Sequence, residues 1–185
     1  MTTSERRANV SIPRFARSVL MLGLALAALA GPGLAWADGG GGGGGDGAPR
    51  SDPGRPEDPS YGAAVRAIKA REYAKAIPLL EGVVSRDGKN ADAHNWLAYA
   101  IRSNGDAARS IPIYEKALAL DPKHRGAHEY IGEAYLVLDN LPKAKEHLAR
   151  LDKLCLLGCS QYRDLKQSVE AYERSGGKVK PTAGH

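Results

Sequence analysis

The amino-acid sequence predicts an all-α protein, an α-solenoid of three helix-turn-helix repeats plus a C-terminal capping helix. Residues 57–158 divide into three successive units of 34 residues (57–90, 91–124 and 125–158), and apolar residues recur at corresponding positions of each unit. Residues 159–175 form one more amphipathic segment, with Ser160 as its expected N-cap. Because the last repeat of a solenoid leaves an apolar face uncovered, we expect this segment to be the helix that covers it.

Each repeat is predicted to contain two helices joined by a tight turn. The larger apolar residues recur at spacings of three and four, which is the pattern of one buried helix face. The turns are expected near Gly105 and near Asp139–Asn140, where a left-handed residue can end the first helix. Pro78 and Pro112 share one position near the start of the second helices. We expect them to cost little there, because an amide in a first turn has no acceptor four residues earlier.

The repeats resemble the tetratricopeptide repeat, whose pattern has small residues at positions eight and twenty, aromatic residues at eleven and twenty-four, and proline at thirty-two. The second repeat matches best, with Tyr114 and Pro122, and the third supplies Gly132 and Tyr135. The first repeat departs from the pattern, with Gly88 where the proline would stand. The resemblance implies a right-handed solenoid that acts as a non-catalytic scaffold for a larger complex.

In this family the first helices of the repeats line a concave groove, so the resemblance implies a protein or peptide ligand in that groove and no cofactor. Tyrosine and arginine are typical of interface hot spots, and an asparagine can hydrogen-bond an extended backbone. Some members hold a C-terminal carboxylate with a clamp of lysines, asparagines and an arginine. That clamp is absent, because Tyr61, Val65 and Trp96 occupy its positions. The candidate groove residues are Tyr61, Lys69, Asn95, Tyr99, Arg102, Glu129 and Glu133.

Residues 1–37 are predicted to be a secretory signal peptide, with a basic start, an apolar run and a small-x-small site before Asp38. A retained membrane anchor is the alternative, but the apolar run at 19–30 is shorter than the roughly 20 residues that a spanning helix needs. We therefore expect no stable membrane span after cleavage and export to the periplasm or cell envelope, or secretion. Residues 38–56 contain seven consecutive glycines and are predicted to be a disordered linker. Residues 176–185 are predicted to be a flexible tail.

Composition and motifs argue against nucleic-acid binding and catalysis. Without the four arginines and one glutamate of the predicted signal peptide, the net charge of +5 falls to about +2, and the charges are interspersed. No histidine pair forms the H-E-x-x-H motif of metalloproteases, and no serine lies in a Gly-x-Ser-x-Gly motif. Glu129 and Glu133 are one helical turn apart, which we interpret as a solvated helix face. We therefore predict that the chain is not an enzyme and has neither catalytic residues nor metal ligands.

Cys155 and Cys159 are the two cysteines of the chain. In an oxidising compartment such a pair is most simply a disulfide. Gly158 lies at the break before the capping segment, where a bend can bring the pair into disulfide geometry. We predict a disulfide that fixes the angle of the capping helix. The alternative is a periplasmic redox or metal-handling protein, although three residues separate the cysteines instead of the two of thioredoxin-type centres.

Overall fold

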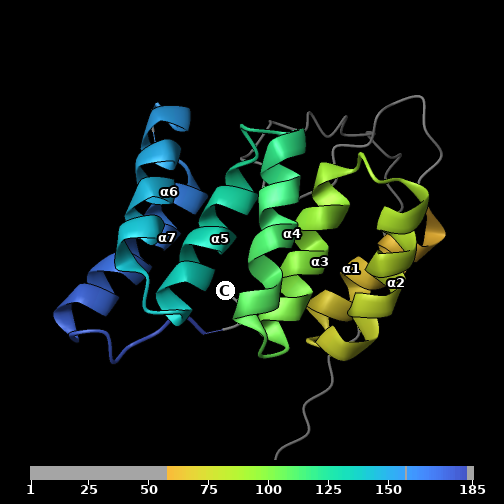
Figure 1. Ribbon diagram of the computed structural model, residues 1–185, viewed down its shortest axis with the longest axis horizontal. Helices are drawn as coiled ribbons and strands as arrows, with labels where there is room; N and C mark the ends of the chain where they lie inside the picture. The colour runs from red at the N-terminus through yellow and green to blue at the C-terminus, as the bar shows by residue number, and fades with distance from the viewer. Residues whose placement is uncertain (1–57, 157, 183–185) are drawn as a thin grey trace, which may run out of the picture. The chain divides into compact units, whose positions relative to one another are not determined.

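The computed structural model describes residues 58–156 and 158–182, and within these ranges it contains α-helices and no β-strand (Figure 1). The predicted signal peptide and linker lie outside the described residues. The helices are α1 (Pro59–Lys69), α2 (Tyr73–Arg86), α3 (Ala91–Ser103), α4 (Ala107–Leu120), α5 (Arg125–Val137), α6 (Leu141–Leu154) and α7 (Ser160–Arg174).

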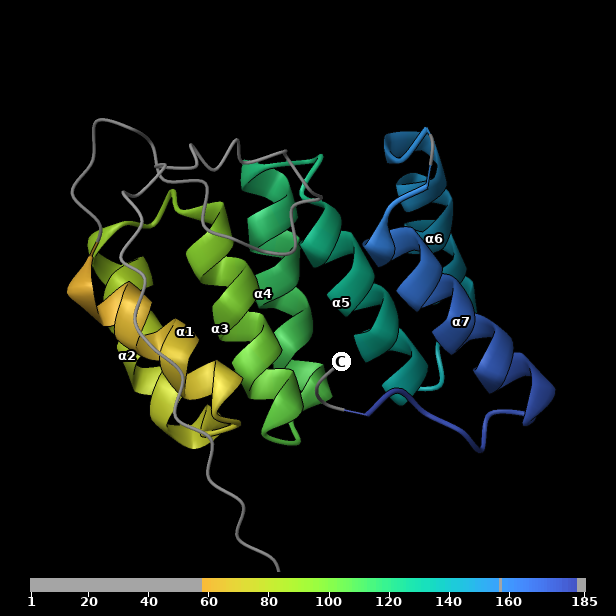
Figure 2. The ribbon, with the colours of Figure 1, turned by 180° about the vertical axis from the view of Figure 1, so that it is seen from behind.

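The helices pack as successive pairs, which confirms the predicted all-α repeat fold. Each helix contacts the next one in the sequence, and α7 contacts both α5 and α6. The first helices of the pairs also contact one another, α1 with α3 and α3 with α5. Figure 2 shows α1, α3, α5 and α7 following one another across the view. One surface of the protein is therefore built from first helices alone.

The 34-residue period is visible in the backbone as one left-handed turn residue per pair. Gly105 has a φ of 102° and Asp139 a φ of 59°, which confirms the two predicted turns. Arg71 stands one period before Gly105 and has a φ of 60°. A residue with a side chain is disfavoured in this conformation by about 1–2 kcal/mol, so the repeat geometry imposes the turn against local preference.

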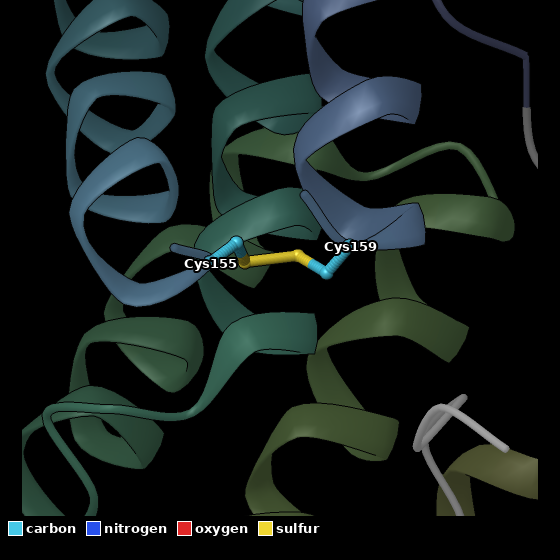
Figure 3. Close-up of a disulfide and its surroundings, with 2 residues drawn as sticks. All are labelled: Cys155 and Cys159. Carbon is cyan, nitrogen blue, oxygen red and sulfur yellow. A yellow bond between two sulfur atoms is a disulfide. The ribbon is translucent and has the colours of Figure 1, made fainter. Parts of the chain in front are cut away.

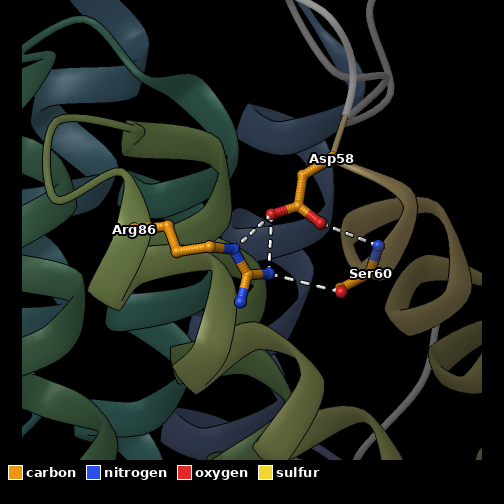
Figure 4. Close-up of polar contacts among 3 residues, drawn as sticks. All are labelled: Asp58, Ser60 and Arg86. Atoms are coloured by element: carbon orange, nitrogen blue, oxygen red, sulfur yellow. Dashed lines mark hydrogen bonds and ion pairs between the residues drawn. The ribbon is translucent and has the colours of Figure 1, made fainter.

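Asp58, directly before α1, bonds to residues of both α1 and α2 (Figure 4). Its Oδ1 accepts a hydrogen bond of 2.8 Å from the backbone amide of Ser60, which caps α1. Its Oδ2 accepts bonds of 2.9 and 2.6 Å from Nε and Nη2 of Arg86, the last residue of α2. The hydrogen bonds from Arg86 hold the pKa of Asp58 below its ordinary value. One carboxylate thus joins the outer ends of the first two helices.

The apolar core runs between the helix pairs. Within the first two repeats and the start of the third, Leu80, Ile101, Tyr114 and Ile131 are almost fully buried. Trp96 packs against this cluster and is partly buried, as its position in the repeat predicts. A second cluster joins the third repeat to α7, and its buried members are Leu136, Ala144, Leu151, Leu165, Val169 and Tyr172.

The expectation for the two shared prolines is wrong. Pro78 and Pro112 are each the sixth residue of their helices, α2 and α4, and lie beyond the first turn. An amide at either position would face the carbonyl four residues earlier, so each proline removes one helical hydrogen bond. Their shared position is a feature of the repeat that capping arguments do not explain.

α7 covers the end of the third repeat through a close helix contact. A Cβ built on Gly132 would lie 2.6 and 2.8 Å from the two methyl carbons of Leu165. Only glycine fits this approach, which explains the small residue at the eighth position of the third repeat. Ser160 is the first residue of α7 and Cys159 is its N-cap, so the expected cap at Ser160 is wrong by one residue.

A disulfide joins Cys155 and Cys159, with Cα atoms 5.5 Å apart (Figure 3). Cys155 ends α6 and Cys159 precedes α7. Gly158 has a φ of +80°, and its amide donates a 2.8 Å hydrogen bond to the carbonyl of Cys155. The two cysteines meet across this turn between two helices, so the disulfide spans the junction that orients α7.

Candidate functional site

The seven candidate groove residues all lie on α1, α3 and α5, the first helices that contact one another in series. Lys69 is exposed. The burial of Glu129 and Glu133 overturns the expectation that they form a solvated face. Contact of this set with a ligand stays a prediction. The six buried candidates are Tyr61, Asn95, Tyr99, Arg102, Glu129 and Glu133.

An ion pair between Arg102 and Glu133 joins the second and third repeats. Nη2 of Arg102 lies 2.9 Å from Oε2 of Glu133, and the two side chains are only 3% and 1% exposed. The hydroxyl of Ser168 on α7 donates a 3.3 Å hydrogen bond to Oε1 of the same carboxylate. Loss of one partner of such a pair leaves an uncompensated buried charge, at a typical cost of about 3–5 kcal/mol. The pair therefore links α3 to α5, and the Ser168 hydrogen bond links the same carboxylate to α7.

Four aromatic side chains lie together beside Arg102, and two of their rings, Tyr99 and Tyr130, contact its guanidinium. The Tyr99 ring lies 4.9 Å from that of Tyr130, 5.6 Å from Trp96 and 6.2 Å from Tyr73, centroid to centroid. The guanidinium carbon is 5.4 Å from the Tyr99 centroid and 5.9 Å from that of Tyr130. Tyr99 is buried, and its desolvation raises the pKa of its phenol. We call Tyr73, Trp96, Tyr99 and Tyr130 the aromatic cluster.

Sequence reasoning identified one member of the aromatic cluster as a site residue and missed three. Tyr73, Trp96 and Tyr130 are partly buried, so part of each ring is accessible. Trp96 and Tyr130 are one period apart in the sequence, and this shared position is the signal that could have found them. Tyr73 begins α2 and reaches the cluster only through the pairing of the helices.

The segment after α7 folds back against the C-terminal end of α5. Nζ of Lys180 donates hydrogen bonds of 3.0 Å to the carbonyl of Val137 and 2.6 Å to Oδ2 of Asp139. Oδ1 of Asp139 also accepts a 2.9 Å bond from the hydroxyl of Tyr172. The bonds from Lys180 and Tyr172 hold the pKa of Asp139 below its ordinary value. A cleft of about 230 Å³ lies between α7 and residues 179–182.

The described residues contain no group of three or more histidine, cysteine, aspartate or glutamate residues that is placed to hold a metal ion. None of the helices described is long and apolar enough to cross a membrane.

Family comparisons identify the repeats. Two sequence models of the tetratricopeptide repeat match, one over residues 61–124 and one over residues 102–168, and together they span more than half of the chain. The chain belongs to the tetratricopeptide repeat family. The second match ends inside α7, so α7 stands where the first helix of a fourth tetratricopeptide unit would lie. No curated protein matches the chain.

Solved tetratricopeptide structures share the fold at low sequence identity. The type III secretion translocator chaperone SycD of Yersinia enterocolitica has a TM-score of 0.57 and 16% identity, over 63% of this chain and 83% of that one. PcrH in complex with the chaperone-binding region of PopD has a TM-score of 0.57 and 15% identity, over 63% and 90%. The first repeat domain of Spaghetti (RPAP3) bound to the HSP90 peptide SRMEEVD has 0.56 and 19%, over 62% and 90%.

Proposed function

We propose that this protein is a non-catalytic tetratricopeptide scaffold that binds a protein or peptide along α1, α3 and α5. The observation that carries the proposal is the aromatic cluster around Arg102, because aromatic and arginine side chains supply most of the energy at interface hot spots. The cluster combines buried anchoring parts with partly accessible rings. Such a surface can take apolar side chains of a ligand without rearranging its own core.

The structural neighbours support this proposal. Three of them are complexes: SycD with a peptide of the translocator YopD, PcrH with the chaperone-binding region of PopD, and Spaghetti with an HSP90 peptide. Tetratricopeptide repeat proteins are typically non-catalytic binding scaffolds. By the same reasoning, we propose that this chain assists the assembly of a larger complex.

The chemistry of the first helices favours an internal peptide segment with apolar or aromatic anchors. Tyr61, Val65 and Trp96 replace the polar residues that clamp a C-terminal carboxylate in some family members. Lys69, at the end of α1, is the exposed charge among the candidate residues. A ligand would therefore be held by its side chains near the aromatic cluster, with an acidic residue of the ligand facing Lys69.

We also propose that the protein acts in the periplasm or cell envelope. The basic start, apolar run and cleavage motif of residues 1–37 support export. The disulfide between Cys155 and Cys159 is compatible with an oxidising compartment, where such bonds persist. Fractionation of cells with detection of the chain by its mass would test both the destination and the cleavage before Asp38.

Affinity capture from the envelope fraction tests the binding proposal. The test variant is Lys69→Glu/Tyr73→Ala, which changes an exposed side chain at the end of α1 and a partly buried member of the aromatic cluster. Lys116→Glu is the matched control, because it reverses an exposed charge on α4, a second helix. We expect the control to capture the same partners as the unmodified chain and the test variant to lose them. Equal capture by both variants would place the binding surface elsewhere.

A further inference from the structure

Two histidines on neighbouring helices face each other at the junction of α5 and α6. Nδ1 of His128 lies 3.0 Å from Nδ1 of His147, and the ring centroids are 5.3 Å apart. His128 is buried and His147 is half-buried. Sequence spacing did not reveal the pair, because 19 residues separate the two histidines and only the helix hairpin brings them together.

The hydrogen bonds around His128 make its Nδ1 an acceptor directed at Nδ1 of His147. Nε2 of His128 lies 3.1 Å from the carbonyl oxygen of Pro122, which can only accept, so Nε2 carries the proton. Nδ1 of the neutral ring is therefore unprotonated. A histidine that donates its second nitrogen to a backbone carbonyl is held in the way that is usual for metal ligands.

The ring of His147 is also held in place. Tyr135 stacks on it, with centroids 5.8 Å apart and planes inclined by 21°, and the Tyr135 hydroxyl donates a 3.5 Å hydrogen bond to Glu115. His128 accepts a hydrogen bond at Nδ1 while its Nε2 carries the proton, so its ring is neutral. A neutral imidazole is the form that binds metal ions.

We propose that His128 and His147 form a two-histidine site for a divalent transition-metal ion, with Cu²⁺ as the preferred ion. Binding would replace the hydrogen-bonded proton between the two Nδ1 atoms by the metal. The proton moves from Nδ1 to Nε2 of His147, so the ring takes its other neutral tautomer and no charge is lost. Water would fill the remaining coordination positions on the solvent side of His147.

The present separation of the two nitrogens is close to that of neighbouring ligands in a tetragonal complex, and on binding the rings would turn so that both Nδ1 atoms point at the ion instead of at each other. With metal–nitrogen distances of about 2.05 Å, two nitrogens 3.0 Å apart subtend an angle of about 94° at the metal. This is close to the right angle between neighbouring ligands in tetragonal Cu²⁺ or Ni²⁺ complexes. A tetrahedral Zn²⁺ site would need the nitrogens to separate to about 3.3 Å. Among these ions, Cu²⁺ also has the highest general affinity for nitrogen ligands.

The charges near the pair are of both signs and set a moderate affinity. On α6, Lys143 and Arg150 oppose a cation, and Glu146 attracts one but is paired with Lys143 at 2.8 Å. Before α5, Asp121 attracts a cation and His124 is close enough to lower the pKa of His128. The site thus depends on the two imidazoles more than on a local field.

The second repeat provides an internal control. His94 occupies the same repeat position as His128, and its Nε2 also lies near a backbone carbonyl, that of Gly88 at 3.2 Å. The position that corresponds to His147 is Ile113, so His94 has no histidine opposite it. His147→Ile therefore makes the third repeat like the second, with a residue that the fold already accepts there.

Cu²⁺ titration of the full chain, followed by calorimetry and electron paramagnetic resonance, tests the site. We expect the unmodified protein to bind one Cu²⁺ with hyperfine structure from two imidazole nitrogens, and His94→Asn to behave alike. His147→Ile should weaken this binding at least about tenfold and remove the two-nitrogen signal. His147→Gln is the second variant should the isoleucine disturb the fold, which far-ultraviolet circular dichroism would reveal.

The outcomes separate a built site from adventitious binding. All the chains keep the terminal His185 and the surface carboxylates, so binding there is common to every variant. Cu²⁺ affinity that is unchanged by both His147 substitutions, or reduced equally by His94→Asn, would overturn the proposal. A parallel check is thermal stability, which Cu²⁺ should raise in the unmodified chain and in His94→Asn but not in the His147 variants.

Discussion

Gly132→Ala should destabilise the protein by forcing α7 away from α5. The new Cβ would meet the Leu165 methyl carbons at 2.6 and 2.8 Å, and the Leu165 side chain is fully buried. The Leu165 side chain cannot move into solvent, so either α7 must shift or Leu165 must adopt another rotamer. Overpacking of this kind typically costs about 1–3 kcal/mol.

The net effect is smaller than the clash, because alanine is a better helix former than glycine by about 1 kcal/mol. We therefore expect Gly132→Ala to lower the free energy of unfolding by about 1 kcal/mol in total. Gly62→Ala is the matched control, since its Cβ would meet only the exposed arm of Arg66, at 3.4 Å. That control should gain stability by about 0.5–1 kcal/mol.

Urea unfolding of the single and double variants measures both effects. In a Leu165→Ala background the clash disappears, so Gly132→Ala should become neutral or stabilising there. Hydrogen exchange of α7 should accelerate in Gly132→Ala alone. If Gly132→Ala raised the free energy of unfolding by as much as Gly62→Ala does, the close contact between α5 and α7 would be refuted.

Three further outcomes follow from the structure. The pKa of His147 is about 4 in the folded protein, against an ordinary value of 6.5. The free energy of unfolding should therefore be highest above about pH 6.5 and fall by up to about 2–3 kcal/mol as the pH drops toward 4. Urea unfolding measured against pH should show a much flatter profile for His147→Ile. Reduction of the Cys155–Cys159 disulfide should destabilise the α6–α7 junction by about 2 kcal/mol on the loop-entropy model. Hydrogen exchange should then accelerate in α7 before it accelerates in α1 to α4. A uniform acceleration would contradict a local role of the disulfide. Arg71→Gly, at a φ of 60°, should raise the unfolding free energy by about 1 kcal/mol, and an unchanged urea midpoint would argue against strain at this turn.

The sequence alone predicts the helix pairs because the same buried pattern occurs three times. A single apolar run is ambiguous, but a pattern repeated every 34 residues fixes the register of small positions such as Ala98 and Gly132. The turn residues Gly105 and Asp139 follow from the same register. Local capping was less predictable, as Pro78 and Ser160 show, because a helix boundary can shift by a residue or more without changing the pattern.

The candidate site was predicted as a set of positions and not as a set of contacts. The family pattern placed Arg102 and Glu133 on first helices, but not their burial or their mutual ion pair. Side chains 31 positions apart meet only when two helices cross at a particular rotation, which one sequence does not state. The same holds for His128 and His147, whose contact depends on the angle of the α5–α6 hairpin.

The central claim is that α1, α3 and α5 bind a peptide beside the aromatic cluster. Trp96 belongs to that cluster, and Trp36 is the one other tryptophan of the chain, so Trp36→Phe makes the emission specific to the site. Peptides selected from a random library would be titrated into this chain while Trp96 emission is recorded. We expect a saturable change in Trp96 emission that persists in Lys116→Glu and disappears in Lys69→Glu/Tyr73→Ala. Selected peptides that bind all three chains equally, without changing Trp96 emission, would contradict it.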